Sequence, residues 1–170
     1  FRRLAVFAGR FDLAAANAMG GPDTLDVLGR LVDKSLVLAE PTQRATRYRL
    51  LVTLRSYAWE RLREAGEAEL AASRPVDHFL ARAEDLYVPT ESVDGRTRDL
   101  DVDLDDLRTA LDWCARANPA AGLRLIAATV NVWWRRSCAE GRQWAHLFLD
   151  RCPSASLARC RALYAAGRLE

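Results

Sequence analysis

The chain has 170 residues, of which half are hydrophobic and 28% are charged, and its formal net charge is +2. No apolar run approaches the roughly 20 residues of a membrane span, so the composition argues against a membrane protein. Residues 1–66 contain 11 Lys or Arg against 7 Asp or Glu, whereas residues 67–170 contain 14 against 16. The N-terminal part is mildly basic, below the concentrated positive charge of a strong nucleic-acid binder.

The cysteines are Cys114, Cys138, Cys152 and Cys160. Their spacing matches no paired zinc motif, so no metal site is expected. All four lie in apolar, helical contexts, which favours reduced thiols in a cytoplasmic protein. Phe1 already lies in a helical pattern and is not Met, which suggests a piece of a longer chain.

The first part of the chain predicts three short helices. Residues 1–9 carry an apolar helical face and end at Gly9, and Asp12 is expected to cap an alanine-rich helix. Asp23 or Thr24 is expected to cap the third helix. The face predicted to be buried on that helix consists of Leu25, Leu28, Leu31 and Val32.

A hairpin and another helix follow. Residues 36–39 form an apolar run, residues 40–46 are polar, and residues 47–51 begin by alternating basic and aromatic side chains, which predicts two strands. Thr53 is expected to cap a helix that ends at Gly66. Three helices, a hairpin and a closing helix predict a winged-helix domain over residues 1–66.

The rest of the chain predicts only helices. Residues 67–98 are expected to form a connecting helix that starts near Pro75, followed by a polar loop. Residues 99–170 show apolar residues at helical spacing, divided at Asn118-Pro119 and Pro153. One helix is expected to run through Leu123, Ile126, Ala127, Val130, Trp133 and Trp134. The last helix is expected to bury Leu157, Cys160, Leu163 and Tyr164. The fold class is therefore mainly α, with a small hairpin and a truncated, tetratricopeptide-like antiparallel array over 99–170.

Two surfaces are candidates for binding. Arg44, Arg47 and Arg49 of the wing are positioned to contact phosphate, although the third helix carries more acids than bases. A second surface combines aromatic and basic side chains, as many partner sites do. Its residues are Trp133, Trp134, Arg135, Arg136, Arg142 and Trp144. Packing between helices is the alternative role for these tryptophans.

No pattern supports catalysis. The acidic run from Asp99 to Asp106 lacks the Gly and Glu that a calcium loop needs, so it is interpreted as a helix start. His78 and His146 have no metal ligand at the right spacing. The chain also lacks a Gly-x-x-x-x-Gly-Lys-Ser/Thr motif, so it is not expected to be an enzyme or to hold a cofactor.

Several segments in order resemble the middle of bacterial STAND-type signal-transduction ATPases, in particular large LuxR-type transcriptional regulators of actinobacteria. These segments are FRRLAVFAGRF, LGRLVDKSLV, TRYRLLVTLRSYAWERL, LDDLRTALDWCARA and the stretch from Trp133 to Trp144. Some relatives place Met-His-Asp, which faces bound ADP, where this chain has Leu50, Leu51 and Val52. Close bacterial relatives often have Glu at the last position.

The resemblance implies a coupling module in a signal-transducing transcriptional regulator. The winged helix would contact an upstream domain that binds ATP or ADP, and the helical array would sense a ligand or a protein. A C-terminal domain would bind DNA. The alternatives are a winged helix that itself binds DNA, and a scaffold for protein–protein interaction without nucleotide coupling.

Overall fold

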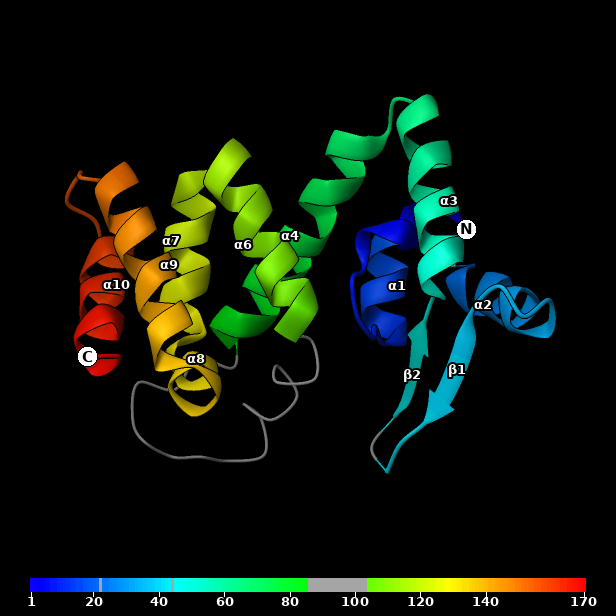
Figure 1. The fold of residues 1–170 in the computed structure, drawn as a ribbon, viewed down its shortest axis with the longest axis horizontal. Helices are drawn as coiled ribbons and strands as arrows, with labels where there is room; N and C mark the ends of the chain where they lie inside the picture. The colour runs from blue at the N-terminus through cyan, green and yellow to red at the C-terminus, as the bar shows by residue number, and fades with distance from the viewer. Residues whose placement is uncertain (22, 44, 86–103) are drawn as a thin grey trace. The chain divides into compact units, whose positions relative to one another are not determined.

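The computed structural model describes residues 1–170 except 22, 44 and 86–103 (Figure 1). The described chain forms two compact units, Phe1–His78 and Phe79–Glu170. Helix α4, Ala68–Asp85, begins in the first unit and ends in the second. The fold is mainly α with one antiparallel hairpin, as predicted.

The first unit has the predicted order of elements. They are a 3₁₀ helix η1 (Arg2–Val6), α1 (Leu13–Gly20), α2 (Thr24–Asp33), β1 (Leu38–Pro41), β2 (Thr46–Arg49) and α3 (Val52–Glu64). The strands pair with Leu38 opposite Arg49 and Pro41 opposite Thr46. Phe11 adds a bridge on the other edge of β2, where its N–H and C=O exchange hydrogen bonds of 2.9 and 2.8 Å with Tyr48.

Aromatic side chains build the core of this unit. Phe7 stacks on Phe11 with ring centroids 4.5 Å apart, and Phe11 stacks on Tyr48 at 6.0 Å. Leu28 of α2 and Leu62 of α3 are fully buried in the same cluster. The core therefore ties the helices to the hairpin, because Phe11 contributes both a bridge and a stacked ring.

Local signals set most of the helix ends. Asp12 caps α1, since its Oδ1 accepts the N–H of Ala15 at 2.8 Å. Gly66 has φ +68, and the N–H of Glu67 reaches the carbonyl of Leu62 at 3.2 Å, which closes α3 as predicted. Thr53 was expected to cap α3, but the helix begins at Val52 and its N-cap is Leu51.

Two further expectations for the N-terminal helices are wrong. The helix expected over residues 1–9 is a shorter 3₁₀ helix, η1, which covers Arg2–Val6 only. Leu25 was placed on the buried face of α2, but 56% of it is exposed, because the helix turns Leu28 and Leu31 into the core, with Val27 and Val32 packed beside them. Leu25 therefore belongs to the outer face.

Helix α4 runs through Pro75, which lies inside the helix and not at its start. Proline removes one main-chain donor within a helix, and burial of Pro75, Val76 and Phe79 accompanies this cost. The loop predicted over residues 88–98 lies outside the described residues.

The second unit is an array of antiparallel helices. They are α6 (Leu104–Ala117), α7 (Pro119–Ala128), α8 (Val130–Arg136), α9 (Cys138–Arg151) and α10 (Leu157–Arg168). Helix α7 packs against α6, α9 and α10. Asn118 caps α7, since its side chain accepts the N–H of Ala121 at 3.1 Å.

Two predictions for this unit need correction. One helix was expected through Leu123 and Trp134, but it divides at Thr129, whose hydroxyl bonds back to the carbonyl of Leu125 at 2.8 Å. Helix α10 was predicted correctly, but the face predicted to be buried was the wrong one. The residues expected inside, Leu157, Cys160, Leu163 and Tyr164, are exposed, and Ala162, Ala165 and Ala166 are buried.

Candidate functional site

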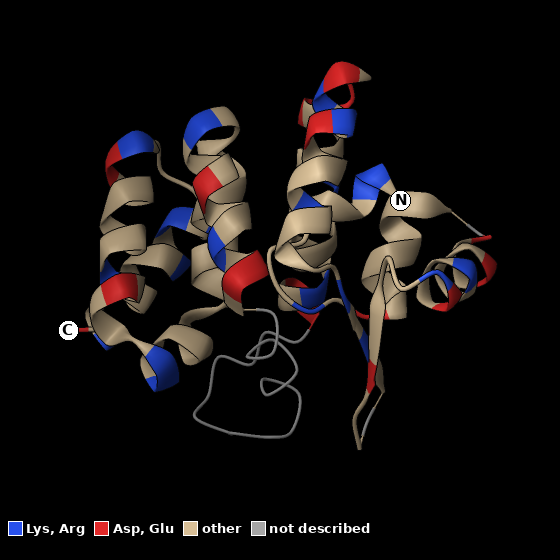
Figure 2. Cartoon of the chain, turned by 45° about the vertical axis from the view of Figure 1, so that its right-hand side comes forward, with Lys and Arg blue, Asp and Glu red and all other residues tan. Residues whose placement is uncertain are grey.

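The outer face of α2 is exposed in the first unit. Its exposed residues carry mixed charge (Figure 2). They are Leu25, Asp26, Gly29, Arg30 and Asp33, with Asp23 before the helix and Lys34 after it. Acids outnumber bases in this set, so the face repels phosphate overall, while Leu25 offers an apolar contact.

The wing presents its charge in pairs. Glu40 of β1 lies between two guanidiniums, since its Oε1 accepts Nε of Arg49 and its Oε2 accepts Nε of Arg10, each at 2.6 Å. The hydrogen bonds from Arg49 and Arg10 lower the pKa of Glu40. The carboxylate therefore stays ionised and cancels part of the positive charge that Arg49 would offer to a phosphate.

The other two wing arginines differ from each other. The side chain of Arg47 is only 8% exposed, and its Nη1 lies 3.3 Å from Oδ2 of Asp12. Arg44 lies outside the described residues. Contact of Arg44, Arg47 and Arg49 with phosphate stays a prediction, but Arg47 is turned into the fold, where a bound nucleic acid would not reach it without rearrangement.

Apolar side chains surround the start of α3. Leu50 is buried, whereas Leu51 is 41% exposed and Val52 is 80% exposed. None of these side chains can donate a hydrogen bond, so Leu51 and Val52 offer nonpolar side-chain contacts.

The three tryptophans of the second candidate surface point to different surroundings. Trp133 is fully buried, and its Nε1 donates to Thr129 Oγ1 at 3.1 Å. Trp134 is half exposed, and the guanidinium of Arg168 lies 5.8 Å from its ring centroid. Trp144 stacks on Phe148 with centroids 6.0 Å apart. Trp134 is therefore the tryptophan of this set that is most available to a partner.

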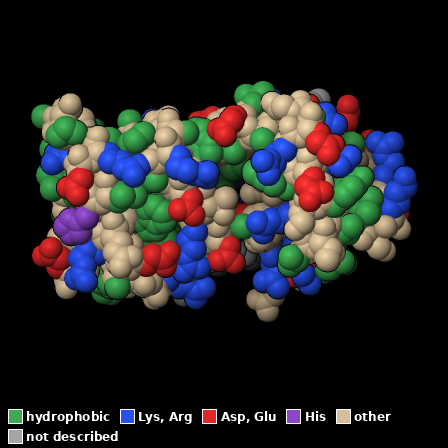
Figure 3. Space-filling view, turned by 45° about the horizontal axis from the view of Figure 1, so that its top comes forward, with side chains coloured by type: hydrophobic (Ala, Val, Ile, Leu, Met, Phe, Trp, Pro, Cys, Tyr) green, Lys and Arg blue, Asp and Glu red, His purple; other side chains and the backbone are tan. Residues whose placement is uncertain are grey.

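The arginines of the same set lie on two helices. Arg135 and Arg136 form the last turn of α8, and Arg142 is exposed in α9. Arg135 donates Nε to the carbonyl of Asn131 at 3.3 Å. On the helical unit, apolar side chains appear among basic and acidic ones (Figure 3). A partner role for this set stays a prediction.

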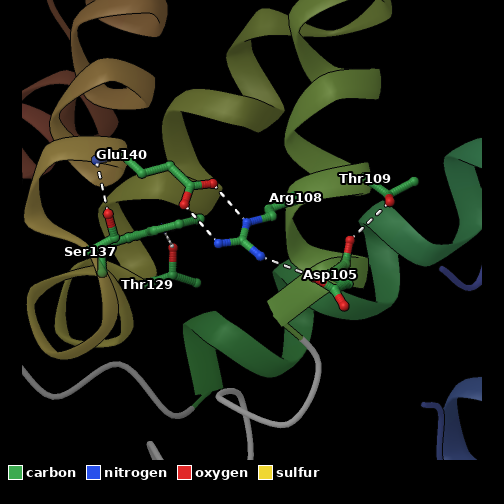
Figure 4. Close-up of polar contacts among 7 residues, drawn as sticks. Asp105, Arg108, Thr109, Thr129, Ser137 and Glu140 are labelled. Atoms are coloured by element: carbon green, nitrogen blue, oxygen red, sulfur yellow. Dashed lines mark hydrogen bonds and ion pairs between the residues drawn. The ribbon is translucent and has the colours of Figure 1, made fainter. Parts of the chain in front are cut away.

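A polar connection between α6 and α9 was not anticipated from the sequence. Arg108 donates Nε and Nη2 to the two carboxylate oxygens of Glu140, both at 2.8 Å, and Nη1 to Asp105 at 3.0 Å (Figure 4). The hydrogen bonds from Arg108 lower the pKa of Glu140, and those from Glu140 raise the pKa of Arg108. Ser137 accepts the N–H of Glu140 at 3.3 Å and caps α9. The Ser-x-x-Glu spacing could have indicated this cap, but not the pairing of Glu140 with Arg108.

Within the part of the chain that the structure describes, no group of three or more His, Cys, Asp or Glu side chains could hold a metal ion. Asp99, Asp101 and Asp103 lie outside it, and Asp105 and Asp106 lie in the first turn of α6, as the helix-start interpretation expects. None of the described helices has the length and apolar character needed to cross a membrane.

Comparison with known proteins agrees with this topology. Residues 1–63 match the family of winged helix-turn-helix domains. Residues 1–63 therefore have a winged-helix fold. Its three helices are η1, α1 and α2, the β1–β2 hairpin is its wing, and Phe11 adds an isolated bridge to β2.

Longer matches cover nearly the whole chain. The chain is 39% identical over 178 residues to proteins of Mycobacterium bovis and Mycobacterium tuberculosis that are named as HTH-type transcriptional regulators. The match covers 96% of this chain and 20% of each relative, so the chain spans about one fifth of their length. An uncharacterised M. tuberculosis protein is 45% identical over 84 residues, which is 45% of this chain and 21% of that protein. No solved structure matches.

Proposed function

We propose that this chain is the regulatory middle of a larger transcriptional regulator. In this proposal the winged helix couples the nucleotide state of an upstream STAND-type ATPase domain, which binds ATP or ADP, to the helical array. The array is tetratricopeptide-like and senses a ligand or a protein in the cytoplasm, and a LuxR-type domain further along binds DNA. The names of the mycobacterial relatives support a regulator, and their length leaves room for such domains.

The observation that carries the proposal is the surface of the winged helix. The outer face of α2 combines Leu25 with more acids than bases, and Glu40 already pairs with Arg10 and Arg49. Such a face favours contact with a protein domain over contact with a phosphate backbone. The ATPase would be held in its ADP state by this contact and released when the array binds its ligand.

The test uses the full-length parent protein. Leu25→Glu should weaken the contact between α2 and the ATPase domain and speed the release of bound ADP, while the fold stays intact because Leu25 is exposed. Leu70→Glu is the matched control, since Leu70 is also exposed, at 60%, but lies in α4. Unchanged ADP release in Leu25→Glu, or a parent protein without a nucleotide-binding domain, would refute the proposal.

The second candidate is direct DNA binding by this winged helix. The family match over residues 1–63 and the names of the mycobacterial relatives favour it. Arg30 is the base on the exposed face of α2, so Arg30→Ala should weaken binding to a DNA duplex. The diagnostic is a DNA-binding constant that falls as the salt concentration rises. The logarithm of the binding constant should fall with the logarithm of the salt concentration, with a slope of about −0.9 for each phosphate contact. A chain that shows no duplex binding even at low salt eliminates this candidate.

A further inference from the structure

Helix α10 is apolar on two opposite faces. Toward α7 and α9 it buries small side chains, those of Ala162, Ala165 and Ala166. Its outer face consists of Leu157, Cys160, Leu163, Tyr164 and Gly167, all of which are exposed. Because successive residues of an α-helix are about 100° apart, these five lie within about 120° of its circumference. A helix that is apolar all round is usually buried, so this outer face is expected to have a cover.

The arginines on either side of the outer face leave it apolar. Arg159 is held at the opposite side, since its Nη1 donates to the carbonyls of Leu149 and Cys152 at 2.5 and 2.7 Å. Arg168 lies at the edge of the face, with its guanidinium 5.8 Å from the ring centroid of Trp134 in α8. An apolar surface can therefore approach the centre of the outer face without burying either guanidinium.

The neighbouring helix α9 has an outer face suited to water. The exposed residues of that face include Arg142, Gln143, His146 and Asp150. On α10, by contrast, both leucines and the tyrosine of the outer face are at least half exposed. Removing their apolar area from water is favourable, whereas covering the polar face of α9 is not. A packing contact is therefore expected at α10 and not at α9.

The connections within the helical unit indicate which segment can cover α10. Asn118 joins α6 to α7, and residues 152–156 join α9 to α10. Helices joined by such short connections lie side by side and antiparallel. In Figure 1, α10 is the outermost described helix of this unit, and Glu170 lies two residues beyond it. The mycobacterial relatives, of which the chain spans about one fifth, have the length for further helices.

We propose that the outer face of α10 packs against the apolar face of a further helix, which follows Glu170 in the parent protein. The two leucines and the tyrosine of α10 fill this contact. Gly167 leaves room for a large side chain of the covering helix, because nothing lies within 4 Å of a Cβ at that position. The inference rests on the proposed function, in which the chain is the middle of a longer regulator, and it names the segment that extends the helical array.

Cys160 lies within the outer face and reports on the cover. Mass spectrometry measures how fast a maleimide labels Cys160 in the whole chain and in the full-length parent protein. Labelling in the parent should be at least about tenfold slower, because a packed helix keeps the reagent from the thiol. Leu163→Glu places a charge in the contact and should restore most of the rate in the parent. Gln143→Glu, on the outer face of α9, is the matched control and should leave Cys160 protected.

A photo-crosslink identifies the covering segment. Tyr164→benzoylphenylalanine keeps an aromatic side chain on the outer face of α10 and is introduced into the parent protein. Its crosslink should reach one of the roughly 30 residues that follow Glu170 in the same molecule, which is the length of one short connection and one helix. His146→benzoylphenylalanine in α9 is the control and should not reach that segment. Circular dichroism on each variant confirms that the helices are retained.

The results also separate this proposal from the proposed function. Slow labelling of Cys160 in the whole chain, or equally fast labelling in the parent, overturns the covering helix. A crosslink to a second copy, to residues 86–103 or to a distant domain overturns it as well. A local crosslink in a parent without a nucleotide-binding domain supports the covering helix and refutes the coupling. Exposed Cys160 in a parent whose Leu25→Glu variant releases ADP faster overturns the covering helix alone.

Discussion

Asp12 connects the first turn of α1 to Arg47 of β2, which follows it by 35 residues. One carboxylate oxygen accepts the N–H of Ala15 at 2.8 Å, and the other lies 3.3 Å from Nη1 of Arg47. The Arg47 side chain is nearly buried, so this pair helps to fix the wing on the helices. A single side chain therefore serves as a helix cap and as the partner of a buried cation.

The two roles of Asp12 can be measured separately. Asp12→Asn keeps a good capping group but removes the negative charge, and should lower the free energy of unfolding by about 1–3 kcal/mol. Asp12→Ala removes the cap as well and should cost about 1 kcal/mol more. Urea unfolding of the whole chain provides the values. Asp26→Asn and Asp26→Ala, at an exposed position, should stay within about 0.5 kcal/mol.

Asp12 and Arg47 also show which features can be predicted from the sequence and which cannot. Asp12 was recognisable as a cap because the signal is local, whereas the burial of Arg47 depends on a residue far away in the chain. The same limit applies to Phe11, whose bridge to Tyr48 spans the hairpin and two helices. Element order and most helix ends follow from short-range patterns, but the partner of each charged side chain does not.

The helical unit repeats this lesson in two places. The sequence predicted one helix through Thr129, because apolar residues continue at helical spacing there. The break between α7 and α8 becomes visible only from the hydrogen bond that the Thr129 hydroxyl donates to the carbonyl of Leu125. In α10 the larger apolar residues suggested the wrong buried face. Close packing of α10 against α7 and α9 selects the alanines instead, since small side chains let helices approach. The three tryptophans of the second candidate surface do not share one exposed face for a similar reason, because Trp133 fills the core.

Gly122 of α7 faces the ring of Phe148 in α9 so closely that an added Cβ would overlap it. Gly122→Ala should therefore destabilise the helical unit by about 1–3 kcal/mol through overpacking, despite the higher helix propensity of alanine. Gly167→Ala is the control, because nothing lies within 4 Å of a Cβ at that position in α10. That variant should be neutral or more stable by up to about 1 kcal/mol. Thermal unfolding by circular dichroism compares them, and equal midpoints would contradict the tight contact.

Thr129 and Thr109 both return a hydroxyl hydrogen bond to the carbonyl four residues earlier, but only Thr129 is buried. Thr129 Oγ1 also accepts Nε1–H of Trp133 (Figure 4). Thr129→Val leaves that buried indole donor without its acceptor and should cost about 1–3 kcal/mol. Thr109→Val should change the free energy of unfolding by less than about 0.5 kcal/mol. Urea unfolding distinguishes the two, and similar losses would show that the indole bond contributes little.

Glu67 joins the start of α4 to η1, since Arg2 and Arg3 donate to its two carboxylate oxygens at 2.7 and 2.9 Å. These hydrogen bonds lower the pKa of Glu67 from 4.5 to about 2. Because the pKa of Glu67 is lower in the folded state, its ion pairs with Arg2 and Arg3 stabilise the fold fully above pH 4.5. This stabilisation is lost as the pH falls toward about 2. Glu67→Gln should therefore reduce the pH dependence of unfolding between these values. Glu69→Gln, at an exposed position nearby, should leave the dependence unchanged.

Substitution of Glu40 tests whether its ion pairs limit the binding of the wing to DNA. Glu40→Gln removes the carboxylate that pairs with Arg10 and Arg49, and so makes both guanidiniums available to phosphate. Non-specific binding to a DNA duplex at low salt should become tighter, and the salt slope should steepen by about 1 to 2, one for each added phosphate contact. Glu64→Gln changes the net charge equally and frees Arg61 on α3, away from the wing. If both variants gain the same affinity, overall charge and not the wing controls association. If neither gains any, the ion pairs of Glu40 do not limit contact with DNA, and the acids of α2 are the remaining barrier.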